Sequence, residues 1–385
     1  MRTSVLAFSA IVLAAGSAYA ALSPLTTFGN GNIGASDGYR AANEIIIGDS
    51  AGTAFSGNYG YLGTGNNERG MSYNPVTGNL VVVSRANPTG SNGQNVRILN
   101  GQTGADIAGL GGTGALSNTN SQFPVSMVDV AADGAVYVSG LTINATQNLR
   151  IHRWASEGAA GPTVAYDAVI TSPTRVGDSF AVTGSGTGTK IAAAGSNATN
   201  ASNFAVFGTA DGSIFTSTTY ASVPGTITGT NDYRLSLSFV DSDTLIGSQG
   251  TNARITDFTG AVATVTATVP LSVAQRCLDY AVVGGIPLLA TIDANSSLVQ
   301  IFDITNPAAP ILFDQGNNTG ALLALTANGN QTGSVAWGAI SGSTATLYAM
   351  NTNQGIQAFS FAIPEPSCLS LLGLGAAGLL RRRRA

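Results

Sequence analysis

Short runs of alternating apolar and polar residues recur between residues 68 and 362, separated by turns rich in Gly, Asn, Asp and Thr. Alternation with a period of two is typical of antiparallel strands that bury one face. The pattern predicts strands at 70–73, 80–85, 95–99 and about 106–110 in the first unit, at 126–131, 135–139, 149–154 and 163–167 in the second, and at 277–283, 287–292, 298–304 and 309–314 in the fifth. Four short strands per unit predict the blades of an all-β propeller.

The units align on one apolar or aromatic position in the first strand of each. These positions are Met71, Val128, Phe180, Leu237, Tyr280 and Trp337, at intervals of 57, 52, 57, 43 and 57 residues. A right-handed β-solenoid has a similar composition, but its coils repeat every 20 to 30 residues or so. The longer spacing therefore favours the propeller.

The number of units favours six blades. The sixth unit offers three strands, at 334–340, 345–350 and 355–362, and a separate strand is predicted at 22–28. This N-terminal strand could join the last blade as its outer strand and so close the ring, which would cover an exposed strand edge. A seven-bladed ring remains an alternative if residues 43–55 form part of another blade.

The N-terminal 20 residues have the pattern of a secretory signal peptide. Arg2 supplies the positive region, residues 5–15 supply the apolar region, and Ala18 and Ala20 form a small-x-small cleavage site. Export is therefore predicted, with a mature chain that begins at Ala21.

The C-terminal segment, residues 363–385, contains Pro364, Glu365 and Pro366, an apolar stretch at 368–380 and four consecutive arginines. This order resembles the PEP-CTERM sorting signal of bacteria that carry exosortases. The resemblance implies that the Pro-Glu-Pro motif is recognised by an exosortase-type processing enzyme. Thirteen apolar residues span roughly 20 Å as a helix, less than the roughly 30 Å of a bilayer core, which suits a transient membrane stop. A permanent membrane anchor is the alternative.

Residues 21–362, between the two terminal signals, are predicted to form the propeller domain. Two of its segments, 64–75 and 148–154, resemble uncharacterised propeller-like domains that accompany this sorting signal. That resemblance implies a fold and no assigned activity.

Charged residues are scarce, at 9% of the chain against about 25% in typical proteins. With Lys190 as its single lysine, the chain offers no basic face for nucleic acid. Without the signal peptide and the terminal arginines, 11 basic and 20 acidic side chains remain, a net charge of −9. One histidine, His152, and two cysteines, Cys277 and Cys368, are too few for a zinc site of Cys and His ligands, and a disulfide is not expected. No cofactor is predicted.

The scarce charges concentrate at the first strands of the units, which line the central channel of a propeller. We predict that they converge at one mouth of that channel. These candidate ligand-binding residues are Glu68, Arg69, Asp129, Arg175, Asp178, Arg234, Arg276 and Asp279, with Asp129, Asp178 and Asp279 expected at equivalent places.

Three interpretations of this charge cluster stay open. The guanidinium groups could bind carboxylates, sulfates or phosphates of an acidic polysaccharide. The carboxylates could instead bind Ca²⁺, as in lactonase-type six-bladed propellers, although neighbouring arginines would oppose a cation. Finally, each arginine could simply pair with an aspartate and tie the blades together.

The sequence thus favours an exported, non-catalytic propeller of the cell surface or extracellular matrix, with polysaccharide as its possible partner. The alternative is an enzyme of the lactonase or polysaccharide-lyase type that uses the channel carboxylates, either alone or with Ca²⁺. A lyase needs a base, for which Tyr73, Tyr280 or His152 are candidates, while Cys277 beside Arg276 could be an activated thiol or a packed core residue.

Overall fold

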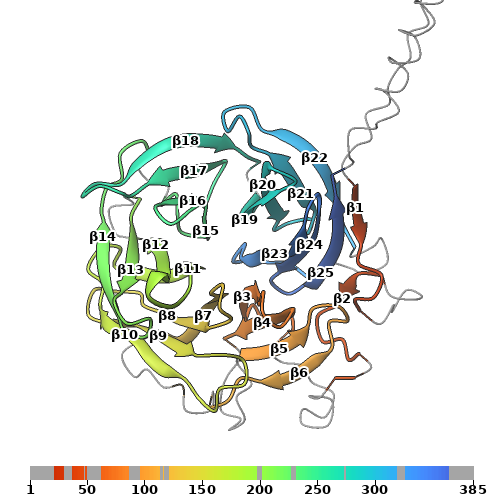
Figure 1. The fold of residues 1–385 in the computed structure, drawn as a ribbon, viewed down its shortest axis with the longest axis horizontal. Coiled ribbons are helices and arrows are strands. Elements are labelled where there is room, and N and C mark those ends of the chain that lie inside the picture. Colours follow the sequence, from red (N-terminus) through yellow and green to blue (C-terminus); the bar gives the residue numbers. More distant parts are fainter. Residues whose placement is uncertain are drawn as a thin grey trace, which may run out of the picture.

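The fold is a ring of six small antiparallel β-sheets around a central axis (Figure 1). The structure, a computed structural model, describes residues 21–29, 37–46, 48–49, 62–85, 96–112, 116, 121–196, 202–226, 231–272, 275–318 and 326–363. The signal peptide, with Ala18 and Ala20, and the sorting motif Pro364, Glu365 and Pro366 lie outside the described residues. In the described part, no helix is long and apolar enough to cross a membrane.

Each of the first five blades contains four strands in sequence order. Blade 1 is β3 Glu68–Tyr73, β4 Asn79–Ser84, β5 Val96–Asn100 and β6 Asp106–Gly109, and blade 2 is β7 Phe123–Val130, β8 Val136–Leu141, β9 Asn148–Trp154 and β10 Thr163–Val169. Blade 3 is β11 Arg175–Thr183, β12 Lys190–Ser196, β13 Phe204–Thr209 and β14 Phe215–Tyr220, and blade 4 is β15 Ser236–Phe239, β16 Thr244–Ser248, β17 Asn252–Asp257 and β18 Thr264–Pro270. Blade 5 is β19 Gln275–Val283, β20 Ile286–Asp293, β21 Val299–Asp303 and β22 Ile311–Gly316. The predicted six-bladed ring is confirmed.

Blade 6 joins the two ends of the chain. Its inner strands are β23 Gly333–Ser341, β24 Thr344–Asn351 and β25 Gly355–Ala362, and the N-terminal strand β1 Ala21–Pro24 pairs antiparallel with the outer edge of β25. A second short strand, β2 Tyr39–Arg40, pairs with β25 farther along the same edge. The N-terminal strand therefore closes the ring as predicted, although it ends at Pro24 rather than continuing to residue 28.

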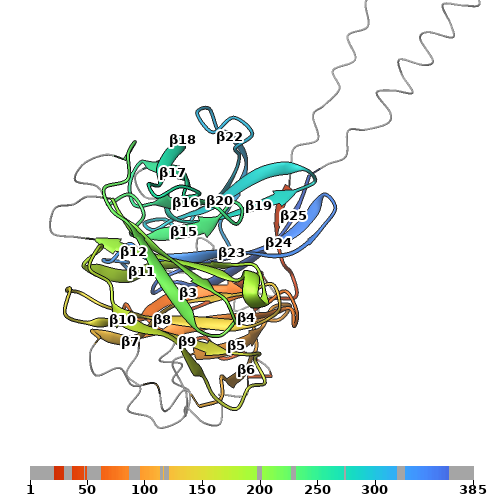
Figure 2. The ribbon, with the colours of Figure 1, turned by 60° about the vertical axis from the view of Figure 1, so that its left-hand side comes forward.

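The hydrophobic core lies between neighbouring blades. Six clusters of buried residues each combine side chains of two adjacent blades, including the pair formed by blades 6 and 1. The second strands supply nearly continuous apolar runs, such as Leu80 to Val83, because both faces of each sheet pack against a neighbour. Figure 2 shows the sheets obliquely, and in Figure 1 the first strands β3, β7, β11, β15, β19 and β23 surround the central axis.

Candidate functional site

Bulges at the starts of the inner strands create a cluster of arginines at one end of the channel. The pairing of β3 with β4 is irregular between Glu68 and Gly70, and that of β19 with β20 between Gln275 and Cys277, so Arg69 and Arg276 are the extra residues of two bulges. A bulge re-aims a side chain away from the ordinary pleat. We call the resulting group the arginine mouth; Arg69, Arg85, Arg175 and Arg234 lie around Asp178, and Arg276 lies beside Arg234.

Asp178 is the carboxylate that these arginines share. It lies in a bulge of β11 between Val176 and Ser179. Its oxygens accept hydrogen bonds from Arg175, including one of 2.7 Å to Nη2, and one of 3.2 Å from Nε of Arg234 in the next blade. Burial acts to raise the pKa of Asp178, but these guanidinium groups outweigh it and hold the pKa below its usual range. Asp178 is therefore ionised and ties blade 3 to blade 4.

Two arginines of the mouth are buried and incompletely bonded. Arg69, which is 7% exposed, donates to the hydroxyl of Thr332 in blade 6, and Arg85 donates to the hydroxyl of Ser126 in blade 2 at 2.6 Å. Among the described residues, neither Nε atom has a hydrogen-bond partner. Burial, with the neighbouring guanidinium groups of Arg69 and Arg175, lowers the pKa of Arg85 to about 9. The mouth thus holds more cationic donors than the one carboxylate at its centre can accept.

Glu68 does not join this group as a ligand-facing carboxylate. Its side chain is 1% exposed and accepts backbone hydrogen bonds from Gly63 at 2.6 Å and from Asn353 in blade 6 at 3.3 Å. Burial raises its pKa. The Glu68 side chain therefore links blades 1 and 6 through its hydrogen bond with Asn353.

Asp129 and Asp279 lie farther along the inner strands than Asp178, contrary to the equivalence predicted from the sequence. The reason is the bulge in β11, which adds Gly177 and Asp178 to one strand without partners on the other. Asp129 accepts from the Ser72 hydroxyl at 2.5 Å and from the backbone N–H of Val182 at 2.6 Å.

Asp279 repeats this arrangement on the other half of the ring. It accepts from the Ser238 hydroxyl at 2.7 Å and from the backbone N–H of Trp337 at 2.9 Å. Each aspartate therefore bridges a serine of the preceding blade and the backbone of the following blade. The same aspartate bridge thus occurs once in blades 1 to 3 and once in blades 4 to 6.

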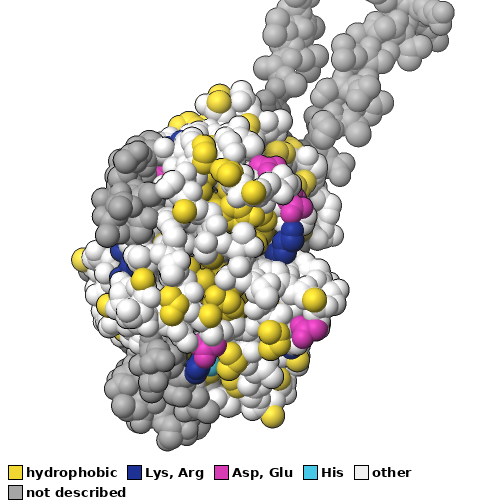
Figure 3. All heavy atoms as spheres, turned by 90° about the vertical axis from the view of Figure 1, so that its left-hand side faces the viewer, with side chains coloured by type: hydrophobic (Ala, Val, Ile, Leu, Met, Phe, Trp, Pro, Cys, Tyr) yellow, Lys and Arg dark blue, Asp and Glu magenta, His cyan; other side chains and the backbone are white. Residues whose placement is uncertain are grey.

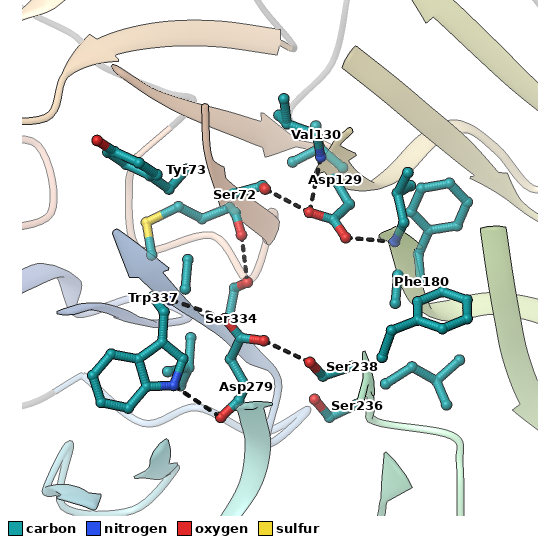
Figure 4. Close-up of a pocket in the computed structure, with 18 of the residues that line it drawn as sticks. Ser72, Tyr73, Asp129, Val130, Phe180, Ser236, Ser238, Asp279, Ser334 and Trp337 are labelled. Atoms are coloured by element: carbon teal, nitrogen blue, oxygen red, sulfur yellow. Dashed lines mark hydrogen bonds between the residues drawn. The ribbon is translucent and has the colours of Figure 1, made fainter. Parts of the chain in front are cut away.

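A pocket of about 330 Å³ opens between these two aspartates, and we call it the axial pocket. All six inner strands contribute to its lining, which extends along their middle and final residues. Figure 4 shows Asp129 and Asp279 with the serines of neighbouring blades around them. Both aspartates are half-buried and line the pocket.

Burial raises the pKa of Asp129 to about 7 and that of Asp279 to about 6. Both pKa values lie above the usual pKa of an aspartate in an unfolded chain. Between about pH 4 and 7 the folded protein therefore still binds protons that the unfolded chain has lost. Stability from these groups is therefore present at low pH and lost as the pH rises through this window. Burial lowers the pKa of His152 to about 4, which acts in the opposite direction below pH 6.5.

This linkage predicts how the Asp129→Asn variant behaves. The Tm of the wild type relative to that of the variant should be higher at pH 5 than at pH 8. The reason is that the wild-type Asp129 loses its proton as the pH rises, whereas the asparagine of the variant does not titrate. Comparing the two proteins cancels the contribution of His152. Thermal melts at the two pH values measure the effect, and a difference that is equal at both would contradict the raised pKa of Asp129.

The other candidate groups lie outside the arginine mouth. Cys277 is buried, and burial raises the pKa of its thiol to about 12, which favours the packed core residue of the two interpretations. Burial also raises the pKa values of Tyr73 and Tyr280. His152, 4% exposed, lies on the third strand of blade 2, away from the channel. In the part of the chain that the structure describes, no three His, Cys, Asp or Glu side chains are grouped to hold a metal ion.

Comparisons with known proteins support both the C-terminal sorting motif and the propeller fold. Residues 362–384 match the PEP-CTERM protein-sorting motif, so the chain carries this signal. A DUF4623 family protein from Bacteroides eggerthii has a similar structure, with a TM-score of 0.60 and 16% identity over 80% of this chain and 72% of that protein. The Malassezia sympodialis allergen Mala s 1 is less similar, with a TM-score of 0.46 and 12% identity over 76% of this chain and 91% of the allergen. No curated protein matches the chain.

The protein is therefore an exported β-propeller. Its PEP-CTERM motif marks it for an exosortase-type enzyme and for the cell surface or extracellular space. The DUF4623 family structure is less than 25% identical to this chain and indicates the fold alone.

Proposed function

We propose that this protein is a non-catalytic binding protein that holds acidic polysaccharide at its arginine mouth, outside the cell. The observation that supports this most directly is the excess of guanidinium groups around one carboxylate, with two buried Nε atoms that lack partners. Arginine binds carboxylate and sulfate groups with paired, planar hydrogen bonds, and such groups recur along acidic polysaccharides.

The outer surface bears few charged side chains, so attraction of an acidic polymer depends on the arginine mouth. Figure 3 shows one side of the ring, where most of the surface is uncharged and the few Arg, Lys, Asp and Glu side chains are scattered. Because the mature body has a net charge of −9, an acidic polymer would be repelled by the protein as a whole. The arginine mouth supplies a local attraction against that background.

The C-terminal signal supports transient attachment to the membrane. We propose that the apolar stretch at 368–380 holds the exported chain at the inner membrane until an exosortase-type enzyme acts at Pro364, Glu365 and Pro366. The described chain ends just after β25 of blade 6, where Ala362 pairs with Ala21 of the outer strand β1. Cleavage there would release the ring without breaking a blade.

An Arg234→Gln, Arg276→Gln double variant tests the binding site, because both side chains are partly exposed and their loss spares the core. We expect binding to polygalacturonate or alginate to weaken at least tenfold, since each charged hydrogen bond contributes about 1.5–3 kcal/mol. Biolayer interferometry at fixed ionic strength measures the affinity.

Arg150→Gln is the matched control for charge. Arg150 pairs with Asp167 on the outer strands of blade 2, far in sequence from the mouth, and its loss should leave the affinity unchanged. Equal binding by wild type and the double variant would show that the arginines only tie blades together. An equal loss in Arg150→Gln would indicate a general charge effect instead of a site.

A further inference from the structure

The axial pocket presents an unusual set of side chains for a small cavity. Of the described residues that line it, Asp129 and Asp279 are the only charged ones. Its volume of about 330 Å³ falls within the range of about 300–1,000 Å³ that is typical of small-molecule sites. The other side chains are serines, threonine, small apolar residues and aromatic groups, among them Tyr73, Phe180 and Tyr280.

The two aspartates are not required by the architecture of the ring. Junctions between blades also use a serine that donates to a backbone carbonyl of the next blade, including the junction of blades 2 and 3, which Asp129 joins as well. These junctions are Ser126 to Gly177 at 2.7 Å, Ser179 to Tyr233 at 2.6 Å, and Ser334 to Met71 at 2.8 Å. A half-buried carboxylate without a cation costs free energy, whereas a serine links two blades without that cost. A cationic ligand in the pocket would offset the cost of the two carboxylates.

The serine hydroxyls of the pocket have already used their hydrogens. Ser72 and Ser238 donate to the two aspartates, and Ser236 and Ser334 donate to the carbonyls of Leu278 and Met71. A hydroxyl has one hydrogen and two lone pairs, so these groups offer a ligand oxygen acceptors. The polar side chains of the pocket thus favour a ligand that is rich in hydrogen-bond donors.

We propose that the axial pocket binds a small organic cation with a primary ammonium group, of the amino-sugar class. An ammonium has three donors and one positive charge, so it can donate to a carboxylate and to serine oxygens of the lining at the same time. Aromatic groups in the lining add a favourable environment for an organic cation. A Ca²⁺ ion takes six to eight oxygen ligands, and the pocket offers two carboxylates that are each already held by neighbouring blades.

The geometry of the carboxylates also suits a fixed binding site. Asp129 Oδ1 accepts from Ser72 and from Val130 N–H, while Oδ2 accepts from Val182 N–H alone. Asp279 Oδ2 likewise accepts from Trp337 N–H alone. A carboxylate has about four acceptor positions, so each aspartate keeps capacity for a further donor while its orientation is fixed by the backbone.

Calorimetric titration with D-glucosamine, using the exported chain, tests this proposal. Glucose and N-acetylglucosamine are matched probes, because they keep the sugar ring and lack the free ammonium. We expect glucosamine to bind at least tenfold more tightly than either neutral sugar, and Asp129→Asn and Asp279→Asn each to weaken that binding at least tenfold. Asp211→Asn, in an exposed turn of blade 3, removes the same charge outside the pocket and should change nothing.

The comparison within wild type keeps the test valid if an aspartate variant fails to fold, which thermal melts would reveal. Equal binding of glucose and glucosamine would overturn the proposal in favour of a neutral sugar site. Binding of CaCl₂ that displaces glucosamine would overturn it in favour of a metal site. Absence of glucosamine binding would overturn it outright.

Discussion

Deleting residues 21–24 should lower the Tm of the mature propeller by about 5–10 °C. These residues form β1, which covers the outer edge of β25 and brings Leu22 against the core between blades 5 and 6. The N–H of Leu22 also donates to Asp314 on the outer strand of blade 5 at 2.6 Å. Burial of a leucine contributes about 1.5–3 kcal/mol, and each strand hydrogen bond about 1 kcal/mol. A loss of about 3 kcal/mol or more corresponds to this change in Tm for a chain of this size.

The experiment compares chains that begin at Ala21 and at Leu25, both ending at residue 363. Removal of residues 364–385 serves as the control, because it leaves every described strand in place and should not change the Tm. The shortened chain should also associate at high concentration, since the exposed edge of β25 can pair with a second molecule. Equal melting temperatures for the two chains would show that β1 does not hold the ring closed.

Strand positions in blade 1 illustrate how far the sequence predicts the fold. The alternation places strands at 70–73, 80–85 and 95–99, and the structure has them at Glu68–Tyr73, Asn79–Ser84 and Val96–Asn100. The agreement arises because each sheet buries its apolar side chains against the neighbouring blades, so the period of two is preserved. The separate strand near residue 22 was predictable for a related reason, since a sixth unit with three strands leaves one edge to cover.

The site was less predictable, because bulges interrupt the alternation. A bulge adds a residue without changing the apolar pattern, so counting along β11 puts Asp178 level with Asp129 and Asp279 although it belongs to the arginine mouth. Arg85 was missed because it follows the second strand of its blade. In the structure the guanidinium carbon of Arg85 lies 4.6 Å from the centroid of the Phe123 ring. The two residues are far apart in the sequence, so this contact gave no signal there.

The serines of the axial pocket could have been found from spacing. Ser72 precedes Asp129 by 57 residues, the same interval that separates several units, and the pair links two adjacent blades. Ser238 precedes Asp279 by only 41 residues, because the loop between blades 4 and 5 is shorter. Repeat spacing thus predicts which blades are adjacent, whereas the partner of a given side chain depends on the register of the inner strands.

The substitution Asp178→Ala should destabilise the protein by about 1–3 kcal/mol. The side chain of Asp178 is buried, and its removal leaves the half-buried Arg175 and Arg234 without their carboxylate beside the already cationic Arg69 and Arg85. Loss of a hydrogen-bonded partner has this magnitude where the remaining charges keep some contact with water. Denaturant unfolding measures the change. The control is Asp167→Ala, whose partner Arg150 lies in an exposed pair, and the expected loss there is about 0–1 kcal/mol.

The same variant separates an anion-binding mouth from a purely structural one. If the arginines attract anions, sulfate or oligogalacturonate should occupy the space that the carboxylate leaves and raise the Tm of Asp178→Ala more than that of the wild type. Ligand that binds only the folded state stabilises it in proportion to RT ln(1 + [L]/Kd), so the rise should grow with ligand concentration. A neutral oligosaccharide of equal length should have no such effect. The absence of a Tm shift in both proteins would mean that the five arginines hold the blades together and bind nothing, since a vacated carboxylate position is where an anion would be held most strongly.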